Sequence, residues 1–274
     1  MSSAAPTESA DRAASAAAVP TAASAAAGVS GRAGSPPPGT ASTLVPDPFA
    51  GPPVGEVRTF HPRRGRLSPQ QQNAIDRMWD AYGIGVDGTP VDFAALFGNP
   101  SPVVLEIGFG MGEATARMAA ADPGTNILAT DIHTPGIGNL LHLVETNRLA
   151  NVRIAEGDAV RLLTEMVAPE SLAGIRVYFP DPWPKSKHHK RRLIRPGFTA
   201  LAASRLAPGG TLHCATDWAP YAAWMLEVLD AEPTLRNTAG HGYAPRPDWR
   251  PMTRFERQGL AKGHEVADLV FRRA

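Results

Sequence analysis

A short apolar run over residues 103–107 leads directly into three closely spaced glycines and then into a helical pattern over residues 113–121. The glycines are Gly108, Gly110 and Gly112. A strand that ends in such glycines before a helix lets a ligand approach the backbone and the unpaired N–H groups of the helix start. This feature constrains the fold strongly, because it is typical of parallel sheets with crossover helices.

The same alternation continues along the chain. Further strands are expected over residues 126–130, 152–154, 175–179, 211–216 and 266–272, and helices over residues 69–82, 137–148, 159–166, 198–206 and 220–229. Residues 68–71, Ser-Pro-Gln-Gln, match a capping box at the start of the first of these helices, and residues 208–210, Pro-Gly-Gly, indicate a turn. Strands that alternate with helices indicate an α/β protein whose parallel sheet is covered on both faces. Ligands of such sheets bind beyond the carboxyl ends of the strands, so the motifs at those ends are candidate site residues.

Acidic residues mark three of these strand ends. Glu106 stands two residues before the first glycine, and Asp131 and Asp158 follow the next two strands. Glu113 occupies the place of the third glycine of a dinucleotide-binding loop, and its charge would repel a pyrophosphate. The acids suit a ligand with an amino group, a sulfonium, a ribose and an adenine, so the pattern predicts S-adenosylmethionine. The alternative is a tight strand-to-helix turn whose helix begins with a favourable charge.

A proline-rich loop follows the fourth of these strands, where residues 179–185 read Phe-Pro-Asp-Pro-Trp-Pro-Lys. The three prolines stiffen the loop and hold Asp181 near Trp183. A carboxylate for an N–H edge and a ring for a face together suit a planar base. The loop therefore predicts a site for a planar base, with Asp181 at its N–H edge and Trp183 nearby.

A basic run follows directly. Five of residues 185–192 are lysine or arginine: Lys185, Lys187, Lys190, Arg191 and Arg192. The whole chain is nearly neutral, with 27 Lys and Arg against 26 Asp and Glu, so a site for nucleic acid must be local. Beside the predicted site loop, the run is expected to contact phosphates, although a solvated face is the alternative. Arg63, Arg64 and Arg66 could extend it. His188 and His189 are poor metal ligands among these cations.

Two further segments are candidate substrate contacts. Asp217 stands at a strand-to-helix junction, where it is either a substrate contact or only the N-cap of the helix. Residues 253–256 read Thr-Arg-Phe-Glu, which matches a helix capping box. A capping box and a substrate contact are compatible.

The start of the chain has a different composition. Residues 1–50 contain 16 Ala and 7 Pro but only five charged residues. The prolines interrupt any helix, and few large side chains are available for a core. We therefore expect a disordered Ala/Pro/Ser-rich tail over residues 1–55 and one globular domain over residues 56–274. The tail lacks the basic start and apolar centre of a signal peptide, and a transit peptide is the alternative to disorder.

The remaining composition narrows the class of protein. No apolar stretch is long enough to cross a membrane, so a cytoplasmic protein is expected. The single cysteine, Cys214, excludes an intramolecular disulfide or a cysteine-based metal site, and its apolar neighbours predict burial.

Taken in order, several segments make the chain resemble the bacterial tRNA (guanine-N7)-methyltransferase family. They are the Gly-Arg-Leu segment before the first helix, Asp92-Phe93-Ala94-Ala95-Leu96-Phe97-Gly98, the glycine loop from Glu106 to Gly112, Phe179-Pro180-Asp181-Pro182-Trp183, Lys190-Arg191-Arg192, Ala215-Thr216-Asp217-Trp218 and Thr253-Arg254-Phe255-Glu256. The resemblance covers residues 60–273, and this order of motifs is very specific.

The resemblance implies a Rossmann-like class I methyltransferase fold with a mostly parallel, seven-stranded sheet and helices on both faces. It also implies methylation of N7 of a variable-loop guanine of tRNA, at position 46. The family uses S-adenosylmethionine at the positions of Glu106, Asp131, Asp158 and Asp181, together with the glycine loop, and Asp181 is also at its catalytic position. The substrate-binding positions of the family match Lys185, Asp217, Thr253, Arg254, Phe255 and Glu256.

This sequence departs from the family pattern at two of these positions. Arg254 stands where lysine is usual, which keeps the charge but changes the geometry. Asp131 replaces a common glutamate, so its contact with a ribose must come from a shorter side chain. No metal is needed for the reaction, and the oligomeric state, monomer or homodimer, is left open.

Two other functions remain open from the sequence. One is a methyltransferase for an exocyclic amino group, because Asp-Pro-Trp-Pro resembles the Asp-Pro-Pro-aromatic loop of adenine methyltransferases, which have a second proline where Trp183 stands. The other is a tRNA-binding module without turnover, which would leave the three cofactor acids unexplained.

Overall fold

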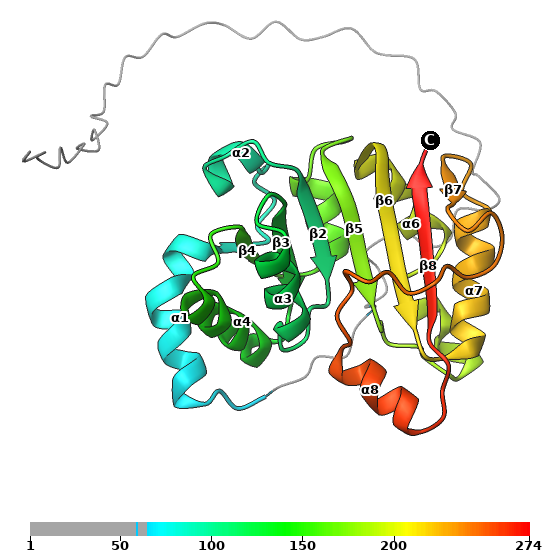
Figure 1. The fold of residues 1–274 in the computed structure, drawn as a ribbon. Coiled ribbons are helices and arrows are strands. Elements are labelled where there is room, and N and C mark those ends of the chain that lie inside the picture. Colours follow the sequence, from blue (N-terminus) through cyan, green and yellow to red (C-terminus); the bar gives the residue numbers. More distant parts are fainter. Residues whose placement is uncertain (1–58, 60–64) are drawn as a thin grey trace, which may run out of the picture. The chain divides into compact units, whose positions relative to one another are not determined.

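A computed structural model of the chain describes Thr59 and residues 65–274. The expected tail over residues 1–55, as well as Arg63 and Arg64, lies outside the described residues, and the domain boundary stays a prediction. Residues 65–274 fold as alternating strands and helices around one sheet (Figure 1).

Within the described residues, the sheet has eight strands in the order β1-β4-β3-β2-β5-β6-β8-β7. They are β1 (Gly83–Gly85), β2 (Val103–Ile107), β3 (Asn126–Asp131), β4 (Val152–Glu156), β5 (Leu172–Tyr178), β6 (Leu206–Thr216), β7 (Leu235–Asn237) and β8 (Ala267–Arg273). Strands β1 to β6 pair in parallel, whereas β8 is antiparallel to both β6 and β7. The predicted α/β fold with a mostly parallel sheet is confirmed. The seven strands implied by the resemblance are corrected to eight in the described part of the chain. The sequence pattern indicated six of them, because the three-residue strands β1 and β7 carry no apolar run.

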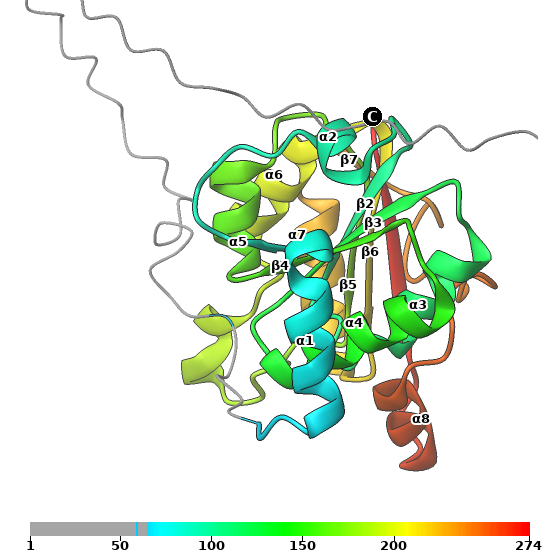
Figure 2. The same cartoon turned by 90° about the vertical axis from the view of Figure 1, so that its left-hand side faces the viewer.

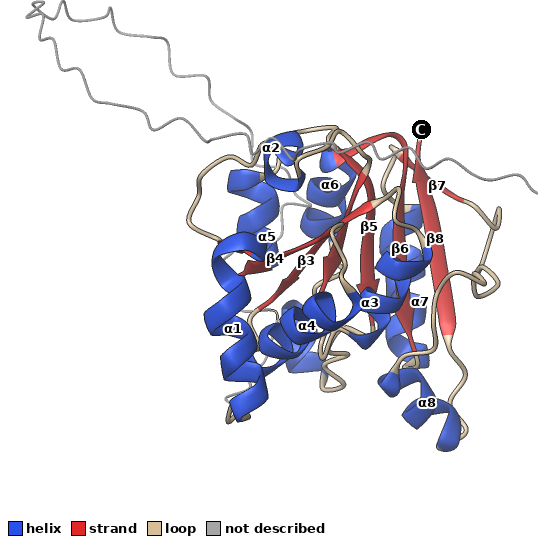
Figure 3. Cartoon of the chain, turned by 60° about the vertical axis from the view of Figure 1, so that its left-hand side comes forward, coloured by secondary structure: helices blue, strands red, loops and turns tan. Residues whose placement is uncertain are grey.

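Helices cover both faces of the sheet (Figure 3). In chain order they are α1 (Pro69–Tyr82), α2 (Phe93–Phe97), α3 (Glu113–Ala121), α4 (Thr134–Asn147), α5 (Ala159–Arg161), a π-helical turn (Leu162–Met166), a 3₁₀ helix (Ser186–Arg191), α6 (Pro196–Arg205), α7 (Ala219–Asp230) and α8 (Arg254–Ala261). Figure 2 shows the sheet nearly edge-on, with α5 and α6 on one side and α3 on the other. No helix in the described part of the chain has the length and apolar character needed to cross a membrane.

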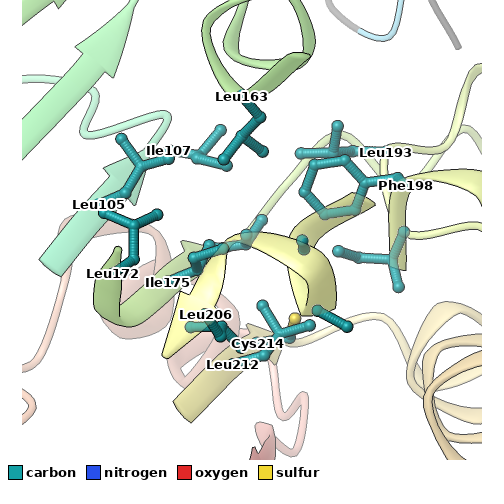
Figure 4. Close-up of a cluster of buried hydrophobic side chains, with 14 of the residues drawn as sticks. Leu105, Ile107, Leu163, Leu172, Ile175, Leu193, Phe198, Leu206, Leu212 and Cys214 are labelled. Atoms are coloured by element: carbon teal, nitrogen blue, oxygen red, sulfur yellow. The ribbon is translucent and has the colours of Figure 1, made fainter. Parts of the chain in front are cut away.

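Two apolar clusters hold these layers together. On one face, Leu105, Ile175 and Leu212 pack with side chains of α5, α6 and α7 (Figure 4). Cys214 is fully buried in this cluster, as predicted, and burial raises the pKa of its thiol. On the other face, Leu140 and other side chains of α4 pack with α1 and α3. The sheet is therefore a rigid support whose carboxyl edge can position a site.

The second face of β5, β6 and β8 is covered differently. The segment that joins β7 to α8 crosses in front of these strands (Figure 1). Arg250 of this segment is fully buried, and it pairs with Glu256 at 2.7 Å and with Asp268 at 2.8 Å. His213 lies 2.7 Å from Asp268, and its other ring nitrogen lies 3.1 Å from the hydroxyl of Tyr178. We call these five residues the buried charge network.

Several local predictions can be compared with the structure. The capping box before α1 forms between Ser68 and Gln71, as expected. The turn expected over residues 208–210 is a bulge inside β6: the pairing with β5 passes from Leu206 to Thr211, and Gly209 has a φ angle of 78°. The basic run forms a 3₁₀ helix that the sequence did not indicate.

Candidate functional site

A cavity lies at the carboxyl ends of the parallel strands, and the predicted cofactor residues converge on it. Gly108 and Gly110 of the glycine loop line it, together with Asp131 after β3, Asp158 after β4 and Asp181 after β5. A second cavity lies beside it and is lined by Glu106 as well as by the same two glycines. The two cavities therefore form one site around the glycine loop.

The glycine loop owes its shape to backbone conformations that side chains disfavour. Gly108, Gly110 and Gly112 have φ angles of 76°, 60° and 77°. A Cβ atom at Gly112, the N-cap of α3, would lie 2.7 Å from Leu140 of α4, so this glycine lets α3 and α4 pack closely. A Cβ atom at Gly108 would meet no atom within 4 Å. The loop therefore presents bare backbone to the cavity, as a ligand-binding loop does.

Glu106 has an unusual environment for a carboxylate. It is 3% exposed, and its Oε2 atom has no hydrogen-bond partner among the described residues. Burial raises the pKa of Glu106 to about 7, although the nearby Arg176 opposes this effect. A buried carboxylate oxygen without a partner is costly, and a bound ammonium group would remove that cost. The site therefore fits the cationic end of S-adenosylmethionine.

The carboxylates of Asp131 and Asp158 both accept hydrogen bonds from nearby backbone N–H groups. The Asp131 carboxylate accepts hydrogen bonds from the N–H groups of Gly110, Ile132 and His133, at 2.7–3.0 Å. Burial raises the pKa of Asp131, and these hydrogen bonds oppose the rise. The Oδ1 atom of Asp158 caps α5 through the N–H group of Val160 at 2.7 Å. Both carboxylates also line the cavity, so each fixes local backbone while facing ligand space.

The loop that carries Asp181 is held in a demanding conformation. Phe179 and Trp183 have φ angles of 53° and 45°, a region that costs energy for residues other than glycine. The Trp183 ring is buried, and the guanidinium of Arg191 lies 5.0 Å from its centre. The Trp183 indole N–H donates to the carbonyl of Thr59 at 3.4 Å. On the other side of Asp181, the Phe179 N–H donates to the carbonyl of Ala215 at 2.7 Å. The loop is thus anchored on both sides of Asp181, which lies half-buried on the cavity wall.

The basic run separates into exposed and buried cations. Lys185, Lys187 and Lys190 are exposed, and Arg191 is half-buried. Arg192 is only 2% exposed, donates to the carbonyl of Pro182 at 3.1 Å and lies over the rings of two aromatic residues of α7. The prediction that Arg192 contacts phosphate is therefore corrected: its guanidinium braces the Asp181 loop from inside.

The segment before and within α8 also divides into two groups. The capping box between Thr253 and Glu256 forms as predicted. Thr253 and Arg254 line the second cavity, and Phe255, 47% exposed, lines both cavities. Glu256 is 2% exposed and pairs with Arg250, so its predicted contact with substrate is corrected to a role in the buried charge network.

Asp217 does not cap α7, because the N-cap of that helix is Trp218. The Asp217 carboxylate lies 3.1 Å from the His264 ring, and a Cβ atom at Gly259 would lie 2.5 Å from it. Asp217 lines neither cavity. In this structure it fixes α8 and the turn after it, so a contact with substrate would have to lie outside the two cavities.

Comparison with known proteins bears on this site. A family model described as "Putative methyltransferase" matches residues 100–269. A tRNA (guanine-N(7)-)-methyltransferase of Streptomyces coelicolor is 65% identical over 219 residues, covering 79% of this chain and 81% of that protein. A protein of the same description from Bordetella parapertussis is 55% identical over 218 residues, covering 80% and 85%. This chain belongs to that methyltransferase family. The expected membership is confirmed.

The comparison with solved structures is less informative than the comparison of sequences. The crystal structure of TrmN from Thermus thermophilus is 18% identical, with a TM-score of 0.46, and the match covers 74% of this chain and 48% of that one. A match at this level does not bear on function.

Several residues that line the site of this family member were not predicted from its sequence. His133, Tyr178 and Phe179 line both cavities, and Arg117 and Arg257 line the second. His133 stands two residues after Asp131, so its position at a strand end could have indicated it. The two arginines lie on helices, where nothing local to the sequence marks the helical face that meets a cavity.

Proposed function

We propose that the chain transfers a methyl group from S-adenosylmethionine to N7 of the guanine at position 46 in the variable loop of tRNA. One observation carries the proposal: the glycine loop and the carboxylates of Asp131, Asp158 and Asp181 meet at one cavity. The relatives named for methylation of a tRNA guanine at N7 support the substrate. We assign this activity to residues 56–274 and expect the protein to act in the cytoplasm.

The cofactor-binding roles follow from charge and position. We assign the ammonium group of the cofactor to Glu106, the ribose hydroxyls to Asp131 and the adenine amino group to Asp158. Gly108, Gly110 and Gly112 would let the amino-acid end pass close to the backbone. When bound, S-adenosylmethionine supplies a methyl group on a positively charged sulfur. The residues of the chain then need only to bind, orient and exclude water.

The substrate roles rest on the Asp181 loop. Guanine N7 already has a lone pair, so no base must remove a proton before methylation. We assign to Asp181 the orientation of the guanine and the stabilisation of the positive charge that develops on its ring. Lys185, Thr253, Arg254 and Phe255 are proposed to contact the substrate around it, and Lys187, Lys190 and Arg191 are proposed to contact phosphates.

Cofactor binding should depend on pH through Glu106. An ammonium ligand needs ionised Glu106, whose pKa is raised to about 7, so affinity should increase as pH rises through 7. Between pH 6 and pH 8 we expect roughly a tenfold gain for S-adenosylhomocysteine, which has the same ammonium group, by titration calorimetry. Glu106→Gln should bind more weakly and lose this gain.

The matched control is Glu113→Gln, which removes a charge from an exposed residue of the second cavity. This variant should keep the pH dependence of the unsubstituted protein, and any titration of the ligand is common to all three proteins. An identical pH dependence in Glu106→Gln would contradict the assignment of Glu106.

The reaction itself can be tested with two tRNA transcripts that differ only at position 46, guanine in one and adenine in the other. With methyl-labelled cofactor, nucleoside mass spectrometry should detect 7-methylguanosine in the first transcript only. Label on an exocyclic amino group would favour the rival methyltransferase. Binding of the transcript without label would favour a binding module, and equal labelling of both transcripts would refute position 46.

A further inference from the structure

The second cavity carries more positive charge than the proposed substrate contact of Arg254 accounts for. Three arginines line it: Arg117 from α3, and Arg254 and Arg257 from α8. All three are exposed, and none makes an ion pair or a side-chain hydrogen bond with another residue in the described part of the chain. The carboxylates in the lining are the buried Glu106 and the exposed Glu113. The outer rim of the cavity, which we define as the three arginines, is therefore positive.

Two of the three rim arginines lie on a helix, α8, that is held in place by several contacts. Arg254 and Arg257 are three residues apart on α8, so their side chains project from neighbouring positions on one face. This helix is fixed by its capping box, by the pairing of Glu256 with Arg250, and by the close packing of Gly259 on Asp217. Guanidinium groups on a fixed helix lose less freedom on binding a phosphate than groups on a mobile loop.

The rim lies across the site from the basic run. Leu193, directly after that run, packs in the cluster on the α5–α7 face, whereas α3 packs in the cluster on the opposite face. Figure 2 accordingly shows the 3₁₀ helix and α8 on opposite sides of the carboxyl edge of the sheet. Phe255, which follows Arg254 on α8, lines both cavities. An exposed ring flanked by cations is typical of a surface for single-stranded nucleic acid.

We propose that Arg117 and Arg257, together with Arg254, form a second phosphate-binding surface that holds the RNA strand on the side of the target guanine away from the basic run. The strand would then cross the cavity mouth between two positive surfaces, with its target base directed at Asp181. Charge complementarity favours this occupant, since a polyanion is attracted by both surfaces while the chain as a whole has a net charge of only +1. This inference rests on the proposed function.

The test is the salt dependence of tRNA binding by Arg117→Gln/Arg257→Gln, measured with an unmodified tRNA transcript and without cofactor. If both arginines touch phosphates, the log–log salt slope should flatten by about 1.4, from ~0.7 per contact to a single strand. The matched control is Arg236→Gln/Arg272→Gln, which removes the same charge from exposed residues on the β7–β8 edge. It should leave the slope unchanged.

A slope equal to that of the unsubstituted protein would overturn the proposal. If the double variant also lost affinity for S-adenosylhomocysteine, the arginines would be assigned to the carboxylate of the cofactor instead. Because binding is measured without methylation, the slope is informative even if the protein proves to methylate another base, and mass spectrometry tests that separately.

Discussion

Asp181→Asn should lower the single-turnover rate of methylation by about 10²–10³ at saturating tRNA and cofactor. The substitution keeps the size of the side chain and an acceptor oxygen but removes the negative charge. If Asp181 offsets the charge that develops on the guanine ring, the loss belongs to the transition state and amounts to roughly 2–4 kcal/mol. Rapid-quench measurement with labelled cofactor would give the rate, and a separate calorimetric titration would give cofactor affinity, which should fall less.

A suitable control for this variant is Asp80→Asn, because Asp80 is exposed on α1 and lines neither cavity. It should methylate at the normal rate. A rate for Asp181→Asn within a few fold of normal would mean that the residue only shapes its loop. A normal rate at saturating cofactor together with a large loss of cofactor affinity would assign it to cofactor binding alone.

The second large effect is expected from Arg250→Met. Arg250 is fully buried between Glu256 and Asp268, and methionine leaves these carboxylates buried without their cation. Breaking a buried pair by removing one partner costs about 3–5 kcal/mol, because the remaining charge stays desolvated. Urea unfolding followed by circular dichroism would measure this loss. Arg246→Met is the control: Arg246 is 39% exposed and 3.6 Å from Glu256, so it should cost less than about 1 kcal/mol.

The effect of Arg250→Met should also depend on pH. Burial alone would raise the pKa of Asp268, but hydrogen bonds from His213 and Arg250 lower it below its usual value. A carboxyl whose pKa is lowered in the folded state stabilises the protein above its unfolded pKa, and this stabilisation is lost as pH falls through the folded pKa. The destabilisation should therefore be largest above about pH 5 and shrink below about pH 4. A pH-independent difference would show that Arg250 stabilises the fold through packing alone.

The sequence predicted those parts of the site that depend on neighbours along the chain. Glycines after a strand, acids at successive strand ends and prolines around Asp181 are local patterns, and the parallel sheet brings them to one edge. Burial of long charged side chains depends instead on contacts across the fold. In the sequence, Arg192 is one more cation of the basic run. Only the folded structure shows that its guanidinium lies over two aromatic rings of α7. In the sequence, Glu256 is likewise a capping residue and a candidate substrate contact. Only the structure shows that it pairs with the buried Arg250.

The same distinction between local patterns and contacts across the fold explains where the observed fold differs from the predicted one. Longer strands have apolar runs and were predicted, but β1 and β7 have three residues each and form because a neighbouring strand offers free hydrogen-bonding groups. A Pro-Gly-Gly sequence usually marks a turn, yet in β6 it accommodates a shift in the pairing with β5. Neither outcome is encoded locally, because each depends on which strand lies alongside.

The position of β8 between β6 and β7 sets an order on folding. Strand β7 is made before β8 but pairs with β8 in the sheet, so it has no place in the ladder until Ala267–Arg273 has emerged from the ribosome. Asp268, which completes the charge balance around Arg250, arrives with the same strand. The parallel strands that carry Asp131, Asp158 and Asp181 can assemble on the nascent chain, whereas α8 and its arginines are fixed only afterwards. A newly made chain would thus form the glycine loop and the acidic strand ends of the site first, and the α8 side of both cavities last.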